Sequence, residues 1–330
     1  RYITLDTVKT IISIILLRIG AGKSIPLNHY FLFIQEYLYF EYLMKLVDFK
    51  VFVSFRDSSF TPAMYGVLKK HDVTTITLQH GFFPKTDPRK NMKYNHYQYL
   101  FTFSEVQSDV FLNVYQSRIE HIKNFGSPLL NNKIVKLKHK NVFDLCFIEQ
   151  IGAENYLRLD DMIFLLGTVL EYAKDNGLSI VYCNRFLRSR KSSNKKCINE
   201  RLDKIDMLLE RYPFVVRSDD SYQSIFDSKL TVTKNSTMGL EAIGMGKCIL
   251  ICDFYASIGF TGLYPKKNKL FFVYDMSKDA IINGLEEVFT ADSEYLNSEL
   301  ERIKPYYMNT NPNEYFNNIE NIISNRLTRK

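Results

Sequence analysis

Ser236 and Thr237 form a short polar turn inside the segment LTVTKNSTMGLEAIGMGKCILICDF (residues 230–254). The residues before them predict a strand ending at Asn235, and those after them predict a helix. A hydroxyl at a helix start caps the first turn, and free N–H groups with the positive end of the helix dipole attract anions. We therefore expect a phosphate site at Ser236, Thr237 and Asn235. Glu241, one turn into the helix, could hold a ribose hydroxyl there; an ordinary helix cap is the alternative.

A second polar turn, Gln79-His80-Gly81, follows the apolar strand TTITLQ. Open α/β sheets bind ligands at the carboxyl ends of their strands, so these residues are expected to line a crevice. The imidazole of His80 titrates near neutral pH and could act as a base or contact a phosphate. Gly81 lets the backbone approach a ligand closely. A loop histidine that only caps local structure is the alternative.

Arg56 and Asp57 follow the strand VFVSF and would reach the same crevice. Asp57 is a second candidate base, which we rank after His80, and Arg56 is expected beside it. A helix cap at Asp57, or an ion pair between the two residues, is an equally good interpretation.

Two strands of the second half also end on polar residues, DLCFIEQ at Gln150 and LSIVYCNR at Arg185. A guanidinium binds phosphate through two parallel hydrogen bonds, so we assign Arg185 to the phosphate side of the crevice. Gln150, at the end of the other strand, is assigned to the same side. A solvated basic loop is the alternative for Arg185, because residues 185–196 hold six basic side chains.

No group of His, Cys, Asp and Glu has the spacing of metal ligands. The acidic pairs Asp160-Asp161 and Asp219-Asp220 precede expected helices and are interpreted as caps. We therefore expect chemistry without a metal or other cofactor. The chain contains neither a P-loop nor a GxGxxG motif after a strand, which argues against ATP hydrolysis and ordinary NAD chemistry.

Strands and helices alternate along the chain, which predicts an α/β protein with parallel sheets. Its length of 330 residues suggests two domains, and the basic stretch at 131–141 suggests the linker. We expect an N-terminal domain at 1–140, with a helical segment at 1–50, and a C-terminal domain at 141–330. Both should be Rossmann-like.

The hydrophobic fraction of 46% and the charged fraction of 24% indicate a folded protein. The five cysteines include no CxxC pair, which favours a reducing, cytoplasmic compartment. The longest apolar run, residues 11–17, is too short to cross a bilayer, and no secretory cleavage site follows it. A net charge of +7 favours anionic partners without choosing among phosphorylated compounds, lipid headgroups and nucleic acid. The aromatic-rich residues 1–50 could rest on a membrane surface; a core-facing helix pair is the alternative.

At the first motif the sequence resembles the C-terminal domain of GT-B glycosyltransferases and of the related teichoic-acid glycerophosphotransferases. The matching positions are Ser236, Thr237, Glu241, Ala242, Gly246 and Lys247, with Cys248 in place of the usual proline. The His-Gly pair at His80 is similar to one in the teichoic-acid enzymes and in capsule-polysaccharide transferases. The resemblance implies a GT-B fold, in which two Rossmann-like domains face each other across a cleft. It also implies donor phosphate at Ser236 and Thr237, and donor ribose at Glu241.

The resemblance further implies a glycosyltransferase that moves a sugar from a nucleotide-sugar, UDP- or CMP-linked, to a surface glycan or lipid-linked glycan. We expect it in the cytoplasm, with peripheral contact at the inner face of the cell membrane and without nucleic acid as a partner. Two alternatives stay open. One is a transferase of glycerophosphate or another polyol phosphate from a CDP-linked donor, and the other is a non-catalytic module that binds anions or nucleic acid.

Overall fold

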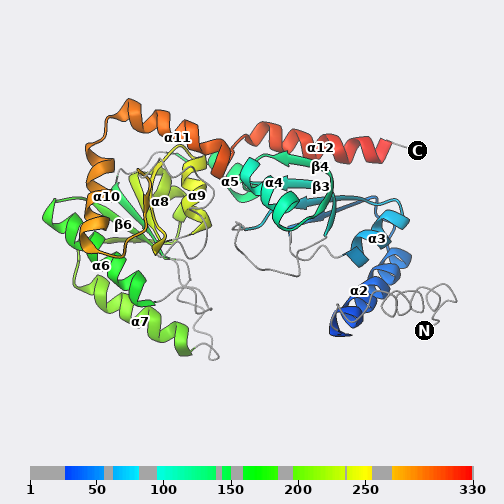
Figure 1. Cartoon of the computed structure of the whole chain (residues 1–330), viewed down its shortest axis with the longest axis horizontal. Helices are drawn as coiled ribbons and strands as arrows, with labels where there is room; N and C mark the ends of the chain where they lie inside the picture. Colours follow the sequence, from blue (N-terminus) through cyan, green and yellow to red (C-terminus); the bar gives the residue numbers. More distant parts are fainter. Residues whose placement is uncertain are drawn as a thin grey trace.

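Two fully parallel sheets organise the chain, one in each half (Figure 1). The computed structural model describes residues 27–55, 62–81, 95–138, 143–149, 159–184, 196–234, 236–254 and 270–328. The predicted α/β class with parallel pairing in both halves is confirmed.

The first half forms a four-stranded sheet whose strands follow chain order, β1-β2-β3-β4. Its elements are α2 (Leu27–Leu46), β1 (Val51–Ser54), α3 (Pro62–Lys70), β2 (Thr74–Leu78), β3 (His96–Thr102), α4 (Glu105–Asp109), the π-helical segment η3 (Val110–Val114), β4 (Arg118–Asn124) and α5 (Pro128–Ile134). Every residue of β2 is buried, as expected for a parallel sheet covered on both faces.

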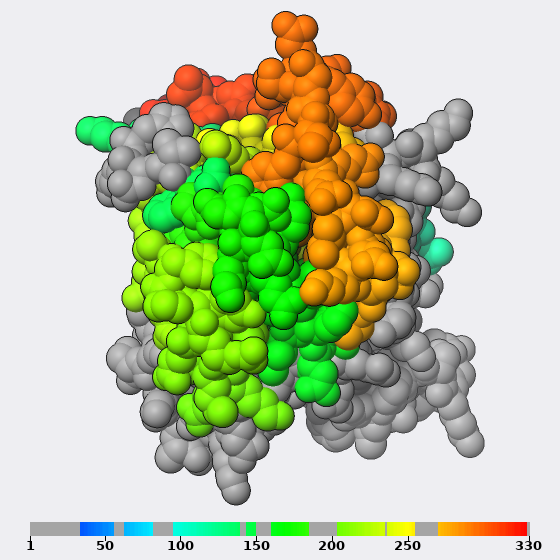
Figure 2. All heavy atoms as spheres, turned by 90° about the vertical axis from the view of Figure 1, so that its left-hand side faces the viewer, coloured from blue at the N-terminus to red at the C-terminus, as the bar shows by residue number. Residues whose placement is uncertain are grey.

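The second half forms a six-stranded sheet in the order β10-β9-β8-β5-β6-β7. Its elements are β5 (Phe143–Ile148), α6 (Leu159–Asp175), β6 (Ile180–Cys183), α7 (Lys196–Glu210), β7 (Val216–Ser218), α8 (Ser221–Phe226), β8 (Ser228–Thr233), α9 (Thr237–Gly244), β9 (Cys248–Cys252), β10 (Phe272–Val273), α10 (Lys278–Thr290) and α11 (Ser293–Tyr307). The outer side of this lobe is formed by α6 together with α7 and α10, which pack on either side of it (Figure 2).

The order of the second sheet reverses between β5 and β8. The chain passes from β5 outward to β6 and β7, and then returns to the other side of β5 to form β8, β9 and β10. Open α/β sheets bind ligands outside the carboxyl ends of their strands at such a reversal. The topology therefore points to the ends of β5 and β8.

The C-terminal helix α12 (Pro312–Thr328) packs on the first sheet and not on the second (Figure 1). The ring of Tyr315 lies edge-on to Phe101 at 5.8 Å and to Phe125 at 6.4 Å between centroids. Ile76 and Leu78 of β2 complete this buried cluster. The boundary expected between residues 140 and 141 falls between the two sheets, while α12, in the range 141–330, packs on the first sheet. The domain division stays a prediction.

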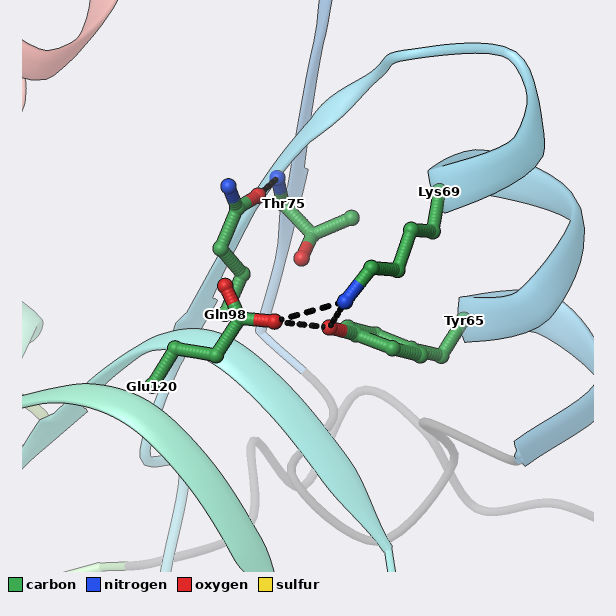
Figure 3. A network of polar contacts seen from close by, with 5 residues as sticks. All are labelled: Tyr65, Lys69, Thr75, Gln98 and Glu120. Atoms are coloured by element: carbon green, nitrogen blue, oxygen red, sulfur yellow. Dashed lines mark hydrogen bonds and ion pairs between the residues drawn. The ribbon is translucent and has the colours of Figure 1, made fainter.

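A polar network fixes α3 to the first sheet (Figure 3). The Tyr65 hydroxyl donates a hydrogen bond to Glu120 on β4 at 2.5 Å, and the Lys69 ammonium donates to the same carboxylate at 3.0 Å. Beside them, the Thr75 backbone N–H donates to the side chain of Gln98 at 2.9 Å. The two bonds to Glu120 hold α3 against the sheet at β4.

None of the described helices has both the length and the apolar content needed to cross a membrane. The exposed aromatic side chains of α2, Tyr39 and Tyr42, stand on its surface together with Leu46, each about 60% exposed. The remainder of the expected helical segment, residues 1–26, lies outside the described residues.

Candidate functional site

The helix start predicted at Ser236 is present at the carboxyl end of β8. Ser236 has an extended backbone (φ −85°, ψ 142°), and its Oγ accepts a hydrogen bond from the Met238 N–H at 3.3 Å. Thr237 is the first residue of α9 and is half-buried. The first N–H groups of α9 therefore lie at the reversal point of the sheet, where backbone donors and the helix dipole favour an anion.

Buried charged residues lie at the carboxyl edge of the same sheet. Glu149 follows β5, Lys234 follows β8 and Asp253 follows β9, and all three are buried. The register pairs Ile148 with Thr233, so the next residues, Glu149 and Lys234, leave neighbouring strands side by side. Charged side chains are almost never buried without a partner, which sets this edge apart from an ordinary sheet end.

Lys234 forms an ion pair with Asp161, in the first turn of α6. The distance from Nζ to Oδ2 is 2.7 Å, and the two side chains are 3% and 7% exposed. The sequence indicated only a helix cap for Asp161 and gave no role to Lys234. No local pattern pairs two residues that lie 73 positions apart, so only the tertiary structure identifies them as partners.

Glu241 lies inside the protein. Its side chain is buried, and its Oε2 accepts a hydrogen bond from the Tyr222 hydroxyl of α8 at 2.9 Å. Burial raises the pKa of Glu241 from 4.5 to about 7, against the opposing effect of hydrogen bonds from Ser127 and Tyr222. A contact to ribose would require the ligand to reach this buried carboxylate. That role stays a prediction.

The buried Glu241 should make stability depend on pH. Below pH 4.5 the carboxyl is protonated in both states, whereas between pH 4.5 and 7 it ionises in the unfolded chain before it does in the folded one. The free energy of unfolding is therefore expected to fall as the pH rises from 4.5 to 7, by about 3 kcal/mol at most. Glu241→Gln, which keeps the shape and an oxygen facing Tyr222, should lose this decrease. Urea unfolding of both proteins across this range would measure it, and identical pH profiles would contradict the assignment.

In the first lobe, Gln79 positions the turn that contains His80. Its Nε2 donates to the Gly81 carbonyl at 2.7 Å and to Gln107 at 2.5 Å, and its Oε1 accepts from the Phe103 N–H at 2.8 Å. Gln79 is fully buried, and its side chain holds the turn in place through these hydrogen bonds. The crevice role expected for it stays a prediction. His80 is exposed, and no atom lies within 4 Å of a side chain built at Gly81.

The other predicted site residues lie outside the described part of the chain. They are Arg56, Asp57, Gln150, Arg185 and Asn235. Four of these directly adjoin described strand ends, because Arg56 follows Phe55, Gln150 follows Glu149, Arg185 follows Asn184 and Asn235 follows Lys234. Their roles stay predictions.

Within the described residues, no three His, Cys, Asp or Glu side chains gather as metal ligands. The buried acids at the sheet edge include Asp161, whose carboxylate is already paired with an ammonium. Metal independence stays a prediction.

No protein-family model matches the chain, and no curated protein sequence matches it. Solved structures do match. The structure of S. aureus MnaA with UDP aligns with a TM-score of 0.55 at 14% identity, covering 99% of this chain and 88% of that one. A UDP-forming α,α-trehalose-phosphate synthase from Burkholderia vietnamiensis aligns with a TM-score of 0.54 at 9% identity, covering 91% and 80%.

A third similar structure, the corresponding synthase from Burkholderia xenovorans, has a TM-score of 0.53 at 9% identity and covers 92% of this chain and 80% of that one. Likeness at such low identity concerns backbone architecture alone. Together with the two parallel sheets, it establishes that this chain has the GT-B fold, built from two Rossmann-like units.

Proposed function

We propose that this protein is a metal-independent glycosyltransferase that moves a sugar from a nucleotide-sugar donor to a surface-glycan acceptor. One observation supports this proposal above all. The N-terminus of α9, capped by Ser236, lies at the reversal point of a six-stranded sheet in a GT-B fold. Backbone donors at that position suit the phosphates of a nucleotide, and one structure of similar fold was solved with UDP.

The proposed chemistry divides between the two lobes. A base in the first lobe, His80 or Asp57, takes the proton of the acceptor hydroxyl. The hydroxyl oxygen then attacks the anomeric carbon, and the bond from that carbon to the donor phosphate oxygen breaks. The leaving nucleotide keeps the bonding electrons, and its negative charge is stabilised by the N-terminus of α9, by Ser236 and Thr237, and by Arg185. Gln150 and Asn235 would contact the same nucleotide.

The proposal also concerns the acceptor and the location of the protein in the cell. We place the protein in the cytoplasm, in contact with the inner face of the cell membrane, where lipid-linked glycans are available. The exposed side chains of Tyr39, Tyr42 and Leu46 support this location, since aromatic and apolar side chains favour the membrane interface.

A panel of donors tests the proposed function. The wild-type chain would be incubated with UDP-, GDP-, CMP- and CDP-linked compounds, with and without EDTA, and the release of nucleotide would be measured. We expect one nucleotide-sugar to be consumed at the same rate in EDTA. Consumption of CDP-glycerol alone would favour the phosphodiester transferase, and consumption of none would favour a binding module. Loss of activity in EDTA with recovery in magnesium or manganese would contradict metal independence.

Ser236 and Thr237 provide a direct test of the phosphate site. Replacing both with alanine should weaken nucleotide binding by about 1 to 3 kcal/mol, the cost of losing hydrogen bonds to a charged group. Calorimetry would measure the affinity, and the thermal midpoint would show that the variant is folded. Ser277→Ala is a matched control, because Ser277 caps α10 through the Ala280 N–H at 3.2 Å in the same manner. Equal nucleotide affinity in the folded double variant and the wild type would refute the assignment.

A further inference from the structure

We propose that Lys234 and Asp161 are positioning residues of the nucleotide site. Their ion pair fixes the beginning of α6 against the turn that leads into α9, and thereby sets the position of the N–H groups that receive the phosphates. This inference rests on the proposed function and adds to it a pair of residues for which the sequence indicated no such role.

The first reason is the cost of burying this pair. The two side chains are 3% and 7% exposed, so both charges have left water. Removing an ammonium and a carboxylate from water costs about as much as their attraction returns, and an apolar pair of similar volume usually stabilises a protein equally well. Stability alone therefore does not explain why charged residues occupy these positions.

The second reason is location. β5 and β8 are neighbours in register, and the sheet order reverses between them. Lys234 directly follows β8, whereas Asp161 belongs to α6, the helix that follows β5. The pair thus joins the two sides of the reversal point, where open α/β sheets bind their ligands.

The third reason is the short chain between Lys234 and the capping residue. Ser236 lies two positions after Lys234, and its Oγ already accepts the Met238 N–H of α9. A displacement of Lys234 would therefore move the turn and the first N–H groups of α9 together. Hydrogen bonds to phosphate depend steeply on distance and angle, so a small displacement is enough to weaken binding.

The test removes both charges at once, because a single substitution would leave one buried charge unpaired and could prevent folding. Lys234→Met with Asp161→Leu keeps a filled, neutral site. The probe is the nucleotide among UDP, GDP, CMP and CDP that the wild type binds most tightly. We expect this variant to keep a wild-type thermal midpoint within a few degrees and to bind the nucleotide about 10- to 100-fold more weakly. The donor KM should rise by the same factor, with kcat changed much less.

A second double variant, Lys234→Gln with Asp161→Asn, retains polar side chains without charge and provides the same measurement if the apolar pair does not fold. The matched control is the exposed ion pair of Lys278 with Glu171, at 2.8 Å, which also involves α6. Replacing both of those residues with alanine should leave nucleotide affinity unchanged.

The possible outcomes separate the two proposals. If the wild type binds a nucleotide and a folded Lys234/Asp161 double variant binds it equally well, the positioning role is refuted and the proposed function is unaffected. If the wild type binds none of the four nucleotides, the proposed function and this inference both fail. Weaker nucleotide binding in the control pair would also overturn the inference, since the effect would then not be specific to the reversal point.

Discussion

His80→Ala is expected to lower turnover about 100- to 10,000-fold while donor affinity stays nearly constant, because general base catalysis contributes on that scale. The structure supplies a reason to expect a loss confined to chemistry. His80 is exposed beyond the carboxyl end of β2, while the turn that contains it is braced by the buried amide of Gln79. Removal of the imidazole should therefore leave the turn in place.

Kinetic measurements can distinguish the two roles considered for His80. A phosphate contact would weaken donor binding together with turnover, whereas a base would affect turnover alone. Asp57→Asn is the companion variant. If His80→Ala keeps near wild-type turnover and affinity while Asp57→Asn is inactive, Asp57 is the base and our ranking of the two residues is wrong.

Gly126→Ala should be the most destabilising of the simple substitutions considered, with a loss of more than about 3 kcal/mol. Gly126 has a φ of +84°, which a side chain disfavours, and its added Cβ would lie 1.8 Å from the Asn309 carbonyl oxygen. The Asn309 carbonyl cannot shift away without disturbing two hydrogen bonds made by the same residue. Its N–H donates to the Phe103 carbonyl at 2.9 Å, and its side chain donates to the Asn124 carbonyl at 2.7 Å.

A matched control separates the effect of this close contact from the effect of the backbone angle. Gly177 also has a positive φ, +63°, but no atom lies within 4 Å of a Cβ built there. Gly177→Ala should therefore cost only about 1 kcal/mol, from backbone strain alone. Denaturant unfolding of both variants would measure the difference. Equal losses would show that the segment at Asn309 yields to the added methyl group, contrary to our expectation.

Local patterns in the sequence determined the start of α9. The strand that ends before the polar turn, the cap at Ser236 and the helix after it were all expected, and the structure contains them. Such features depend on residues a few positions apart, so strand propensity, helix capping and apolar periodicity suffice to predict them.

Features that depend on contacts between residues far apart in the sequence were not predicted. β4 was missed because it is an edge strand whose sequence, RIEHIKN, is mostly polar and largely exposed, so it lacks the apolar run of an interior strand. The sheet on which α12 packs is not visible in the sequence for a related reason. The apolar face of a helix, here with Tyr315, shows that it must pack on something without indicating which sheet provides the partner.

The features of the candidate site also divide into those that the sequence indicated and those that only the structure showed. The sequence by itself identified the polar turns at the strand ends, since the residue types and their local spacing are visible there. Only the tertiary structure decided which side chains face inward. Gln79 braces its own turn, Glu241 is buried against Tyr222, and Lys234 pairs with Asp161 across the reversal point of the second sheet. The physical reason is that burial and charge pairing are set by strand order and helix packing, which bring together residues far apart in the chain and leave no local pattern.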